Sequence, residues 1–572
     1  MQDEFQILES RISNEDKILF LQAEGKVIHH IVNNKLRIVI VFQLGNMQRR
    51  FPVDARCITS DMGTFFQIEA RIALEYVFFR FCKEDAKKQV QLYFEYCDNE
   101  GVWYLLPEKL DLDGEYFLLH PKKKSVGYQI FRGAEYLFLT LLLPLWLLDG
   151  YFVIRGYKKS PYLDNEKKGK KAIFYHAHGL VKHICGFGYS IREFKTNYFK
   201  HKYKHMVKKI KKPELVLFLS ERICETGGNL DLIRSQMRSA GISYEEVIDS
   251  RPIHKLPFSK IAQTAKLTAS AKVIILEDFY PQLGAIDLRE ETKLIQLWHA
   301  CGAFKMFGLS EFGKVEHLEQ NTRNHRNYSY AFVSGKEMVP FYSEAFGISP
   351  DKVLPLGVPR TDIFFDKTYR ESVTERLYKK YPVLRDKRVV LFAPTFRGTG
   401  NKTAYYPKER FIVDSFMDTM PKDMVLVLKN HPFVKSSFYY SPRLQDRVLD
   451  LSEKENINDI LFITSLLITD YSSCIFEASL LDIPMLFYVF DLDEYIRERD
   501  FYFDFSAFAP GVKVSKFDTL IAETKNILSG EYPHDEKHVS RFKTYFLDAL
   551  DGHSKERVTE KIKEIYAEQT KS

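Results

Sequence analysis

Several side chains that can do chemistry stand directly after short apolar segments of this sequence. An imidazole titrates near neutral pH and can act as a general base, whereas guanidinium and ammonium groups bind phosphate oxygens. Serine hydroxyls and the free N–H groups at the start of a helix also bind anions. Together these groups indicate a site that binds an anion-rich ligand and moves a proton. The residues are His299, Arg360, Arg397, Lys429, His431, Ser472 and Ser473.

The stretch 466–477 shows the pattern most clearly. Its apolar start is typical of a buried parallel strand, and its end has the spacing of a helix with one buried face. Between them lie Asp470, Ser472 and Ser473, which either cap the helix or present hydroxyl and N–H groups to a phosphate. For this stretch alone, capping is the favoured interpretation.

The other residues also have ordinary structural explanations. A lone histidine at a strand end is more often structural than catalytic, and a surface ion pair explains either arginine equally well. Their common position after predicted strands favours a site, because open parallel sheets bind ligands at the carboxyl edge. At such a site Glu477, one helical turn after Ser473, would accept hydrogen bonds from a ribose diol.

Strands and helices alternate from about residue 215 onward. The alternation predicts an α/β fold with two Rossmann-like parallel sheets and a ligand cleft between them. We place one in 213–381 and the other, with the C-terminal helices, in 382–572. The expected strands are 215–219, 273–276, 294–297, 330–333 and 353–356, then 388–392, 424–428, 466–469 and 484–489.

Residues 1–130 predict a small β-rich domain, a sandwich or barrel that serves as a binding or spacer module. Short apolar runs at close spacing carry this prediction, and no catalytic constellation is found among them. The expected strands are 27–32, 36–42, 65–68, 74–81, 90–96 and 103–106.

The segment 131–212 contains the most apolar run of the chain, 136–148. As a helix this run would extend roughly 20 Å, short of a bilayer core of about 30 Å, and Pro144 interrupts it. A buried hairpin or core helix is one interpretation. Lysine clusters on both sides, including the basic and aromatic run 195–212, favour docking on an anionic membrane surface over a solvated lysine face.

Composition and motifs narrow the class of protein. The chain has 572 residues, 45% of them apolar and 28% charged, which is typical of a folded protein with several domains. The seven scattered cysteines and the absence of a signal-like N-terminal segment predict a cytoplasmic protein. Neither a Walker loop nor a dinucleotide fingerprint occurs, so no cofactor is expected. Asp491 and Asp493 are interpreted as loop residues, and no metal is expected.

Residues 296–305, Gln-Leu-Trp-His-Ala-Cys-Gly-Ala-Phe-Lys, resemble the Trp-His-Gly/Ala-x-Gly-Ala-x-Lys motif of the CDP-glycerol glycerophosphotransferase family. Members of this family prime and polymerise teichoic acids made of glycerol phosphate or ribitol phosphate. Four further motifs match in order, at 357–362, 392–397, 429–432 and 469–473. The resemblance covers about 215–557. It implies the GT-B arrangement of two Rossmann-like domains.

The resemblance also implies roles for individual residues. His299 would deprotonate the acceptor hydroxyl, and His431 would stabilise the pyrophosphate or the departing CMP. Ala300 and Asn430 stand where many relatives have glycine and methionine, and alanine is found in relatives close to the ribitol-phosphate polymerases. Phosphates would be held by Arg360, Arg397, Ser472 and Ser473, and the ribose by Glu477. The substrate site would also include Trp298, Gly302, Ala303, Lys305, Thr395, Lys429, Asn430 and Asp470.

The implied reaction transfers a polyol phosphate from CDP-glycerol or CDP-ribitol to an undecaprenyl-linked polyol-phosphate acceptor, with release of CMP. The protein would act peripherally at the cytoplasmic side of the cell membrane, without nucleic acid. The length of the chain and its N-terminal domain favour a polymerase over a primase. A GT-B nucleotide-sugar glycosyltransferase of capsule or cell-wall polysaccharide synthesis is the main alternative, and a non-catalytic membrane adaptor is another.

Overall fold

The computed structural model describes two long parts of the chain, with short gaps in each. Secondary structure and burial are given below only for the residues in these two parts. The apolar run 136–148 and most of the lysine clusters around it lie outside them. The described ranges are 3–13, 17–29, 31, 36–45, 47–53, 55–60, 63–78, 83–98, 102–118, 191–221, 228–311, 324–398, 403–499, 501–530 and 535–568.

The N-terminal part is a sandwich of two four-stranded antiparallel sheets, one of the two β-rich forms expected from the close spacing of its short apolar runs. One apolar core unites both sheets, because alternate residues of each strand point into it. The expected strand at 74–81 is wrong, since Leu74–Tyr76 form a 3-10 turn, and the expected strand at 27–32 is wrong because β2 ends at Val27. The strands are β1 Glu4–Ile12, β2 Ile18–Val27, β3 Arg37–Leu44, β4 Met47–Val53, β5 Ala55–Ser60, β6 Gly63–Ala73, β7 Gln89–Cys97 and β8 Trp103–Asp113.

The first parallel sheet has the strand order β10-β9-β11-β12-β13-β14. Its central strands are almost entirely buried, as parallel strands covered on both faces must be. The sequence pattern located every strand of this sheet except β10, because two adjacent glutamates, Glu245 and Glu246, interrupt its apolar residues. The strands are β9 Leu215–Ser220, β10 Tyr244–Ile248, β11 Ala271–Leu276, β12 Lys293–Gln296, β13 Tyr330–Phe332 and β14 Val353–Leu354.

The second parallel sheet has the order β17-β16-β15-β18-β19-β20, which is the Rossmann order 3-2-1-4-5-6. In this order the switch point lies between β15 and β18, where a crevice opens at the carboxyl ends. The strands are β15 Arg388–Ala393, β16 Met424–Leu428, β17 Val448–Asp450, β18 Thr464–Thr469, β19 Met485–Tyr488 and β20 Val512–Val514.

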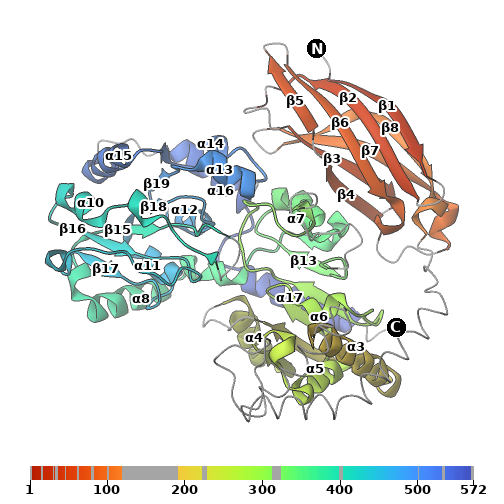
Figure 1. The fold of residues 1–572 in the computed structure, drawn as a ribbon. Helices are drawn as coiled ribbons and strands as arrows, with labels where there is room; N and C mark the ends of the chain where they lie inside the picture. Colours follow the sequence, from red (N-terminus) through yellow and green to blue (C-terminus); the bar gives the residue numbers. More distant parts are fainter. Residues whose placement is uncertain are drawn as a thin grey trace, which may run out of the picture. The chain divides into compact units, whose positions relative to one another are not determined.

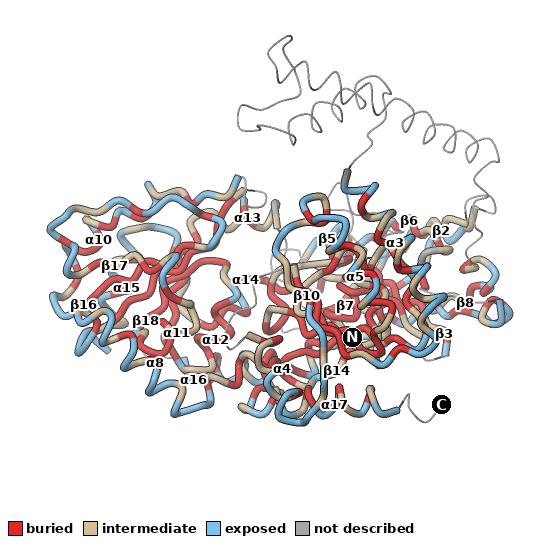
Figure 2. Tube along the Cα trace, turned by 90° about the horizontal axis from the view of Figure 1, so that it is seen from below, coloured by how far each residue is buried: buried red, intermediate tan, exposed pale blue. Residues whose placement is uncertain are grey.

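Helices cover both faces of the second sheet. Figure 1 shows α10 (Val413–Thr419) and α15 (Phe517–Ser529) on one face and α8 (Lys367–Lys380) and α11 (Ile457–Leu461) on the other. In Figure 2 the buried residues follow the strands, whereas α8 and α16 (Glu536–Phe546) carry exposed outer faces.

The C-terminal helix α17 (Ser554–Glu568) does not stay with the second sheet. Val558, Ile562 and Ile565 of this helix join the core of the first sheet, and α17 contacts α4 (Asn229–Ser239). Figure 1 shows α17 beside the strands of the first sheet. The expected grouping of all C-terminal helices with the second sheet therefore differs from the structure, because the apolar face of α17 matches the other core.

A smaller unit comprises 119–205 and 251–265, and only 191–205 and 251–265 of it are described. Its helix, the first part of α3 (Ile191–Lys209), buries Phe199 and Tyr203. The ammonium of Lys195 donates hydrogen bonds to two main-chain oxygens, those of His254 and Leu256. Part of the basic and aromatic run thus packs within the protein instead of facing outward.

Among the described residues, no helix is both long enough and apolar enough to cross a membrane.

Candidate active site

A cavity of about 570 Å³ collects residues that follow the carboxyl ends of strands in both parallel sheets. This is the edge at which open α/β sheets bind ligands, as expected from the sequence. Eight of the predicted site residues line this cavity: His299, Arg360, Lys429, Asn430, His431, Ser472, Ser473 and Glu477.

His299 stands three residues beyond β12. Its Nδ1 lies 3.5 Å from Oδ1 of Asp278, and about a third of its side chain is exposed. Trp298, just before it, has a φ of +56°, a left-handed conformation that non-glycine residues seldom adopt. Such strain is typical of functional turns. Here the strained turn ends the strand and carries His299 to the cavity.

His431 presents its ring differently. The main-chain N–H of Phe433 donates a hydrogen bond to its Nδ1 at 3.2 Å. An Nδ1 that accepts a hydrogen bond carries no proton, so the neutral ring has its proton on Nε2. The ring also packs against Phe396, with centroids 4.6 Å apart. His431 is thereby prepared to donate a hydrogen bond to an anionic oxygen.

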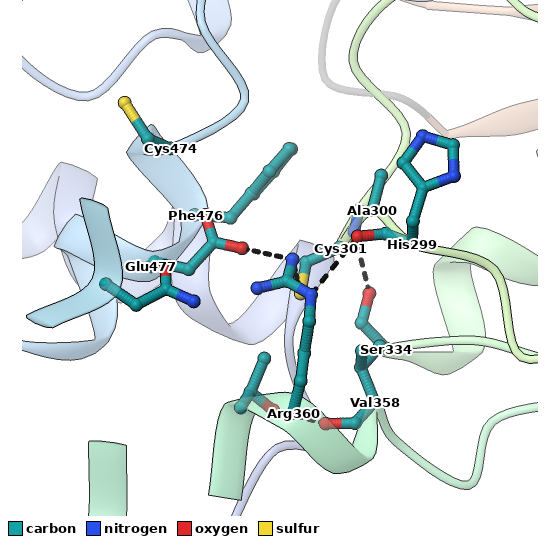
Figure 3. A network of polar contacts seen from close by, with 12 residues as sticks. His299, Ala300, Cys301, Ser334, Val358, Arg360, Cys474, Phe476 and Glu477 are labelled. Atoms are coloured by element: carbon teal, nitrogen blue, oxygen red, sulfur yellow. Dashed lines mark hydrogen bonds and ion pairs between the residues drawn. The ribbon is translucent and has the colours of Figure 1, made fainter. Parts of the chain in front are cut away.

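Arg360 connects the two sheets across the cavity. Its guanidinium forms an ion pair with Glu477 of α12 (Ile475–Leu480), and both side chains are largely buried. The Nε of Arg360 donates to the carbonyl oxygen of His299 at 3.1 Å. Figure 3 shows the carbonyl of His299 facing Arg360 while its imidazole points away from the ion pair. The pair therefore ties the loop that carries His299 to the helix that carries Glu477.

The turn between β18 and α12 places Ser472 and Ser473 at the cavity. Helix α12 has only six residues, so its dipole is weak, and the anion site expected at its start depends on hydroxyl groups instead. Ser473 is exposed, whereas Ser472 accepts a hydrogen bond from the N–H of Cys474. Both hydroxyls remain able to donate to a phosphate.

Lys429 and Asn430 line the cavity but serve mainly to hold the chain after β17. The ammonium of Lys429 donates to the carbonyl oxygens of Ser452 and Glu455 at 2.6 and 2.7 Å. The N–H of Asn430 donates to the hydroxyl of Ser452. These bonds shape the wall 452–458 of the cavity, a role that the sequence pattern did not indicate.

Arg397, Asp470 and Thr395 lie outside the lining of this cavity. The guanidinium of Arg397 is held by Asp470 at 3.0 Å and by both oxygens of Asp491. Burial opposes the charge, but these two carboxylates hold the pKa of Arg397 above its usual value. Asp470 also accepts the N–H of Thr395. Arg397 therefore connects the segments that follow β18 and β19 through Asp470 and Asp491. The sequence predicted it as a phosphate ligand instead.

Four residues of the 298–305 motif also lie outside the cavity lining: Trp298, Gly302, Ala303 and Lys305. Trp298 stacks on Phe307, and Ala303 is buried. Burial lowers the pKa of Lys305 to about 7, although Asp470 opposes the shift. The motif thus forms the loop that positions His299. Trp298, Gly302, Ala303 and Lys305 pack around this loop and do not line the cavity.

Gly302 permits the closest approach between this loop and α12. It has a φ of +61°, and a Cβ added there would lie 2.4 Å from the ring of Phe476. Its N–H donates to Ser334 at 3.0 Å, and its carbonyl accepts from Tyr342 at 2.9 Å. No side chain fits here without moving the loop or the helix.

Gly302→Ala is expected to destabilise the protein by about 3 kcal/mol, because it adds overpacking to the strain of a left-handed residue. Gly241→Ala is the matched control: Gly241 has a φ of +70°, with no atom within 4 Å of an added Cβ. It should cost only about 1 kcal/mol. Thermal unfolding of both variants measures the difference, and equal losses would contradict the close approach to Phe476.

Several residues at the site were not predicted. Asn229 donates to the carbonyl of Trp298 at 2.7 Å and accepts the N–H of Arg360 at 2.9 Å. Glu277 and the loop 452–458 line the cavity. Asp278 contacts His299. Glu277 and Asp278 carried a usable signal, since they directly follow an expected strand.

Two parallel sheets with an anion-suited cavity at their carboxyl edges are typical of enzymes that bind nucleotide-linked substrates. A family model described as CDP-Glycerol:Poly(glycerophosphate) glycerophosphotransferase matches residues 201–564, more than half of the chain. The chain therefore belongs to the CDP-glycerol glycerophosphotransferase family.

Two curated relatives are polymerases of teichoic acid synthesis. The chain is 36% identical over 374 residues to the teichoic acid poly(ribitol-phosphate) polymerase of Bacillus spizizenii, an alignment that covers 65% of this chain and 60% of the relative. It is 37% identical over 366 residues to the teichoic acid ribitol-phosphate polymerase TarL of Staphylococcus aureus. This second alignment covers 62% of this chain and 63% of the relative. The chain thus spans about three fifths of the length of these two relatives.

Among solved structures, the chain is similar to the wall teichoic acid polymerase TagF, with a TM-score of 0.54 and 19% identity. The similarity covers 68% of this chain and 97% of the TagF chain. It shows a shared mixed α/β fold with parallel sheets.

Proposed function

We propose that this protein transfers a polyol phosphate from a CDP-polyol to the terminal hydroxyl of a lipid-linked polyol-phosphate acceptor and releases CMP. The observation that carries the proposal is the pair of oppositely presented histidines on one cavity. The ring of His299 has a carboxylate at Nδ1, whereas the ring of His431 accepts an N–H there. One ring suits proton removal and the other suits hydrogen-bond donation to a leaving phosphate.

In the proposed reaction, Nε2 of His299 takes the proton of the acceptor hydroxyl. The hydroxyl oxygen attacks the phosphorus attached to the polyol, and the bond from that phosphorus to the bridging oxygen of CMP breaks. The Nε2–H of His431 donates to the phosphate of the departing CMP. Arg360 and the hydroxyls of Ser472 and Ser473 bind the remaining phosphate oxygens, and Glu477 binds the ribose. Positioning and positive charge supply most of the rate enhancement.

The donor is proposed to be CDP-ribitol. Four relatives whose names specify ribitol phosphate are 36–38% identical to this chain. Four whose names specify glycerol phosphate are 25–30% identical.

The proposed architecture is the GT-B arrangement, with an acceptor domain at 213–381 and a donor domain at 382–572. The strand orders and the shared cavity support it. We also propose that 131–212 docks peripherally on the cytoplasmic side of an anionic membrane. The basic composition of 131–212 supports the membrane proposal.

Purified protein with a lipid-linked polyol-phosphate acceptor tests the function. CDP-ribitol, CDP-glycerol and a set of UDP-sugars are supplied in parallel, and nucleotide release is measured. We expect CMP from CDP-ribitol at a rate at least tenfold above that from CDP-glycerol, and no UDP. UDP release with no CMP would favour the sugar-nucleotide alternative and overturn the proposal.

A further inference from the structure

The catalytic histidine and an aspartate leave the first sheet side by side. Strands β11 and β12 are parallel neighbours in which Leu276 pairs with Gln296. Residues two or three positions beyond each end therefore reach the same edge of the sheet. Asp278 follows β11 and His299 follows β12, which brings Oδ1 of the carboxylate to 3.5 Å from Nδ1 of the imidazole.

The fully buried side chain of Gln296 fixes the two strand ends relative to each other. Its amide N–H donates to the carbonyl oxygen of Asp278 at 3.1 Å, and its amide oxygen accepts the N–H of Trp298 at 2.9 Å. The same amide N–H group also donates to the hydroxyl of Tyr328 at 3.0 Å. This buried amide is hydrogen-bonded to the main chain at Asp278 and at Trp298. It therefore restricts the main chain on both sides of the contact between Asp278 and His299.

The main chain at His299 is held from the other side as well. Asn229 binds the carbonyl of Trp298, and Arg360 binds the carbonyl of His299. These bonds fix the main chain on both sides of His299. The orientation of its imidazole then depends only on the side-chain torsions of His299 and on the carboxylate of Asp278.

We propose that Asp278 is the positioning residue of the catalytic base: its carboxylate holds the imidazole of His299 with the proton on Nδ1 and the lone pair of Nε2 directed at the acceptor hydroxyl. This inference rests on the proposed function. Asp278 does not belong to the lining of the cavity. It acts through His299, by selecting the tautomer that can accept a proton and by stabilising the imidazolium that forms.

Other charged and titratable groups surround this contact. Glu277 precedes Asp278 and lines the cavity, and Arg360 approaches from the segment after β14. His325 also senses Asp278, but burial lowers its pKa to about 4, so that ring is neutral at physiological pH. Oδ1 of Asp278 accepts the N–H of Phe279, which holds the carboxylate in place. His299 is therefore the imidazole that Asp278 can stabilise as a cation.

Asp278→Asn tests the proposal in the full-length protein. We expect kcat to fall by about 100-fold with the KM for the CDP-polyol nearly unchanged, since donor contacts remain. The ascending limb of the profile of kcat/KM against pH should move to lower pH by about one unit, because a carboxylate favours the charged imidazole and an amide does not. A purely structural role would lower activity without moving the limb.

Asp287→Asn is the matched control, because Asp287 is an exposed aspartate on the same connection between β11 and β12. It should leave both the rate and the profile unchanged. Full activity of Asp278→Asn with an unmoved limb would overturn the proposal. Absence of CMP release by the unsubstituted protein would instead overturn the proposed function.

The tautomer of His299 can be measured without altering Asp278. Nitrogen NMR of the full-length protein with isotope-labelled histidine, with His299→Gln to assign the signals, reports which ring nitrogen carries the proton above the titration of the ring. We expect the proton on Nδ1. A proton on Nε2 would contradict the proposal even if Asp278→Asn proved unable to fold.

Discussion

Replacing His299 by alanine is expected to lower kcat for polyol-phosphate transfer by about 1,000-fold and to leave the KM for the donor nearly unchanged. The physical reason is that His299 stands at the cavity with Asp278 at its Nδ1, which makes it the group suited to take the acceptor proton. Steady-state CMP release with saturating acceptor measures the effect. Binding of the CDP-polyol by calorimetry shows that the donor site is intact.

His553→Ala provides the control for this prediction, because His553 is an exposed histidine outside the cavity lining. Its activity should match that of the unsubstituted protein. If His299→Ala kept its rate within tenfold, the base would have to be a different residue, and the assignment of roles at the cavity would fail.

The second large effect concerns the ion pair between Arg360 and Glu477. Removing one partner leaves a charge with little access to solvent, since the side chain of Glu477 is 6% exposed. Arg360→Met is expected to destabilise the protein by about 3 kcal/mol and to lower kcat/KM by about 100-fold. The loss of activity follows because Arg360 also holds the carbonyl of His299 and is the proposed phosphate ligand.

A double-mutant cycle with Glu477→Gln separates the pair from its surroundings. The double variant should be more stable than the sum of the single losses predicts, with a coupling of about 1–3 kcal/mol. Arg385 and Glu375 form an exposed pair that serves as the matched cycle, and their coupling should stay below about 1 kcal/mol. Equal coupling in the two cycles would show that the cavity pair does not join the two sheets.

Much of the α/β part could be predicted from the sequence because parallel strands leave a strong signal. Continuous apolar runs such as 466–468 located the central strands, and polar residues after them located the cavity edge. The prediction failed where the signal is weak: β10 has two adjacent glutamates among its apolar residues, and the apolar-rich segment that starts at Leu74 begins with a 3-10 turn, Leu74–Tyr76, instead of a strand. Neither pattern separates a strand from its alternatives.

The distribution of roles among the motif residues could not be predicted from spacing alone. Arg397 and Arg360 both follow strands, yet the structure gives the first two carboxylate partners and places the second at the cavity. The partners, Asp470 and Asp491, are 21 residues apart in the sequence. Contacts of this kind depend on the order of strands in the sheet, which a single sequence does not specify. The return of α17 to the first sheet was missed for the same reason.

The fate of one phosphorus atom tests the central claim most directly. The protein is supplied with a CDP-polyol that carries radioactive phosphorus in the phosphate attached to the polyol, together with the lipid-linked acceptor. Attack at that phosphorus predicts label in the lengthened acceptor, unlabelled CMP, and loss of both products in His299→Ala. Label that stays with a released CDP would show that a carbon–oxygen bond is broken instead, and would contradict the proposed phosphotransfer.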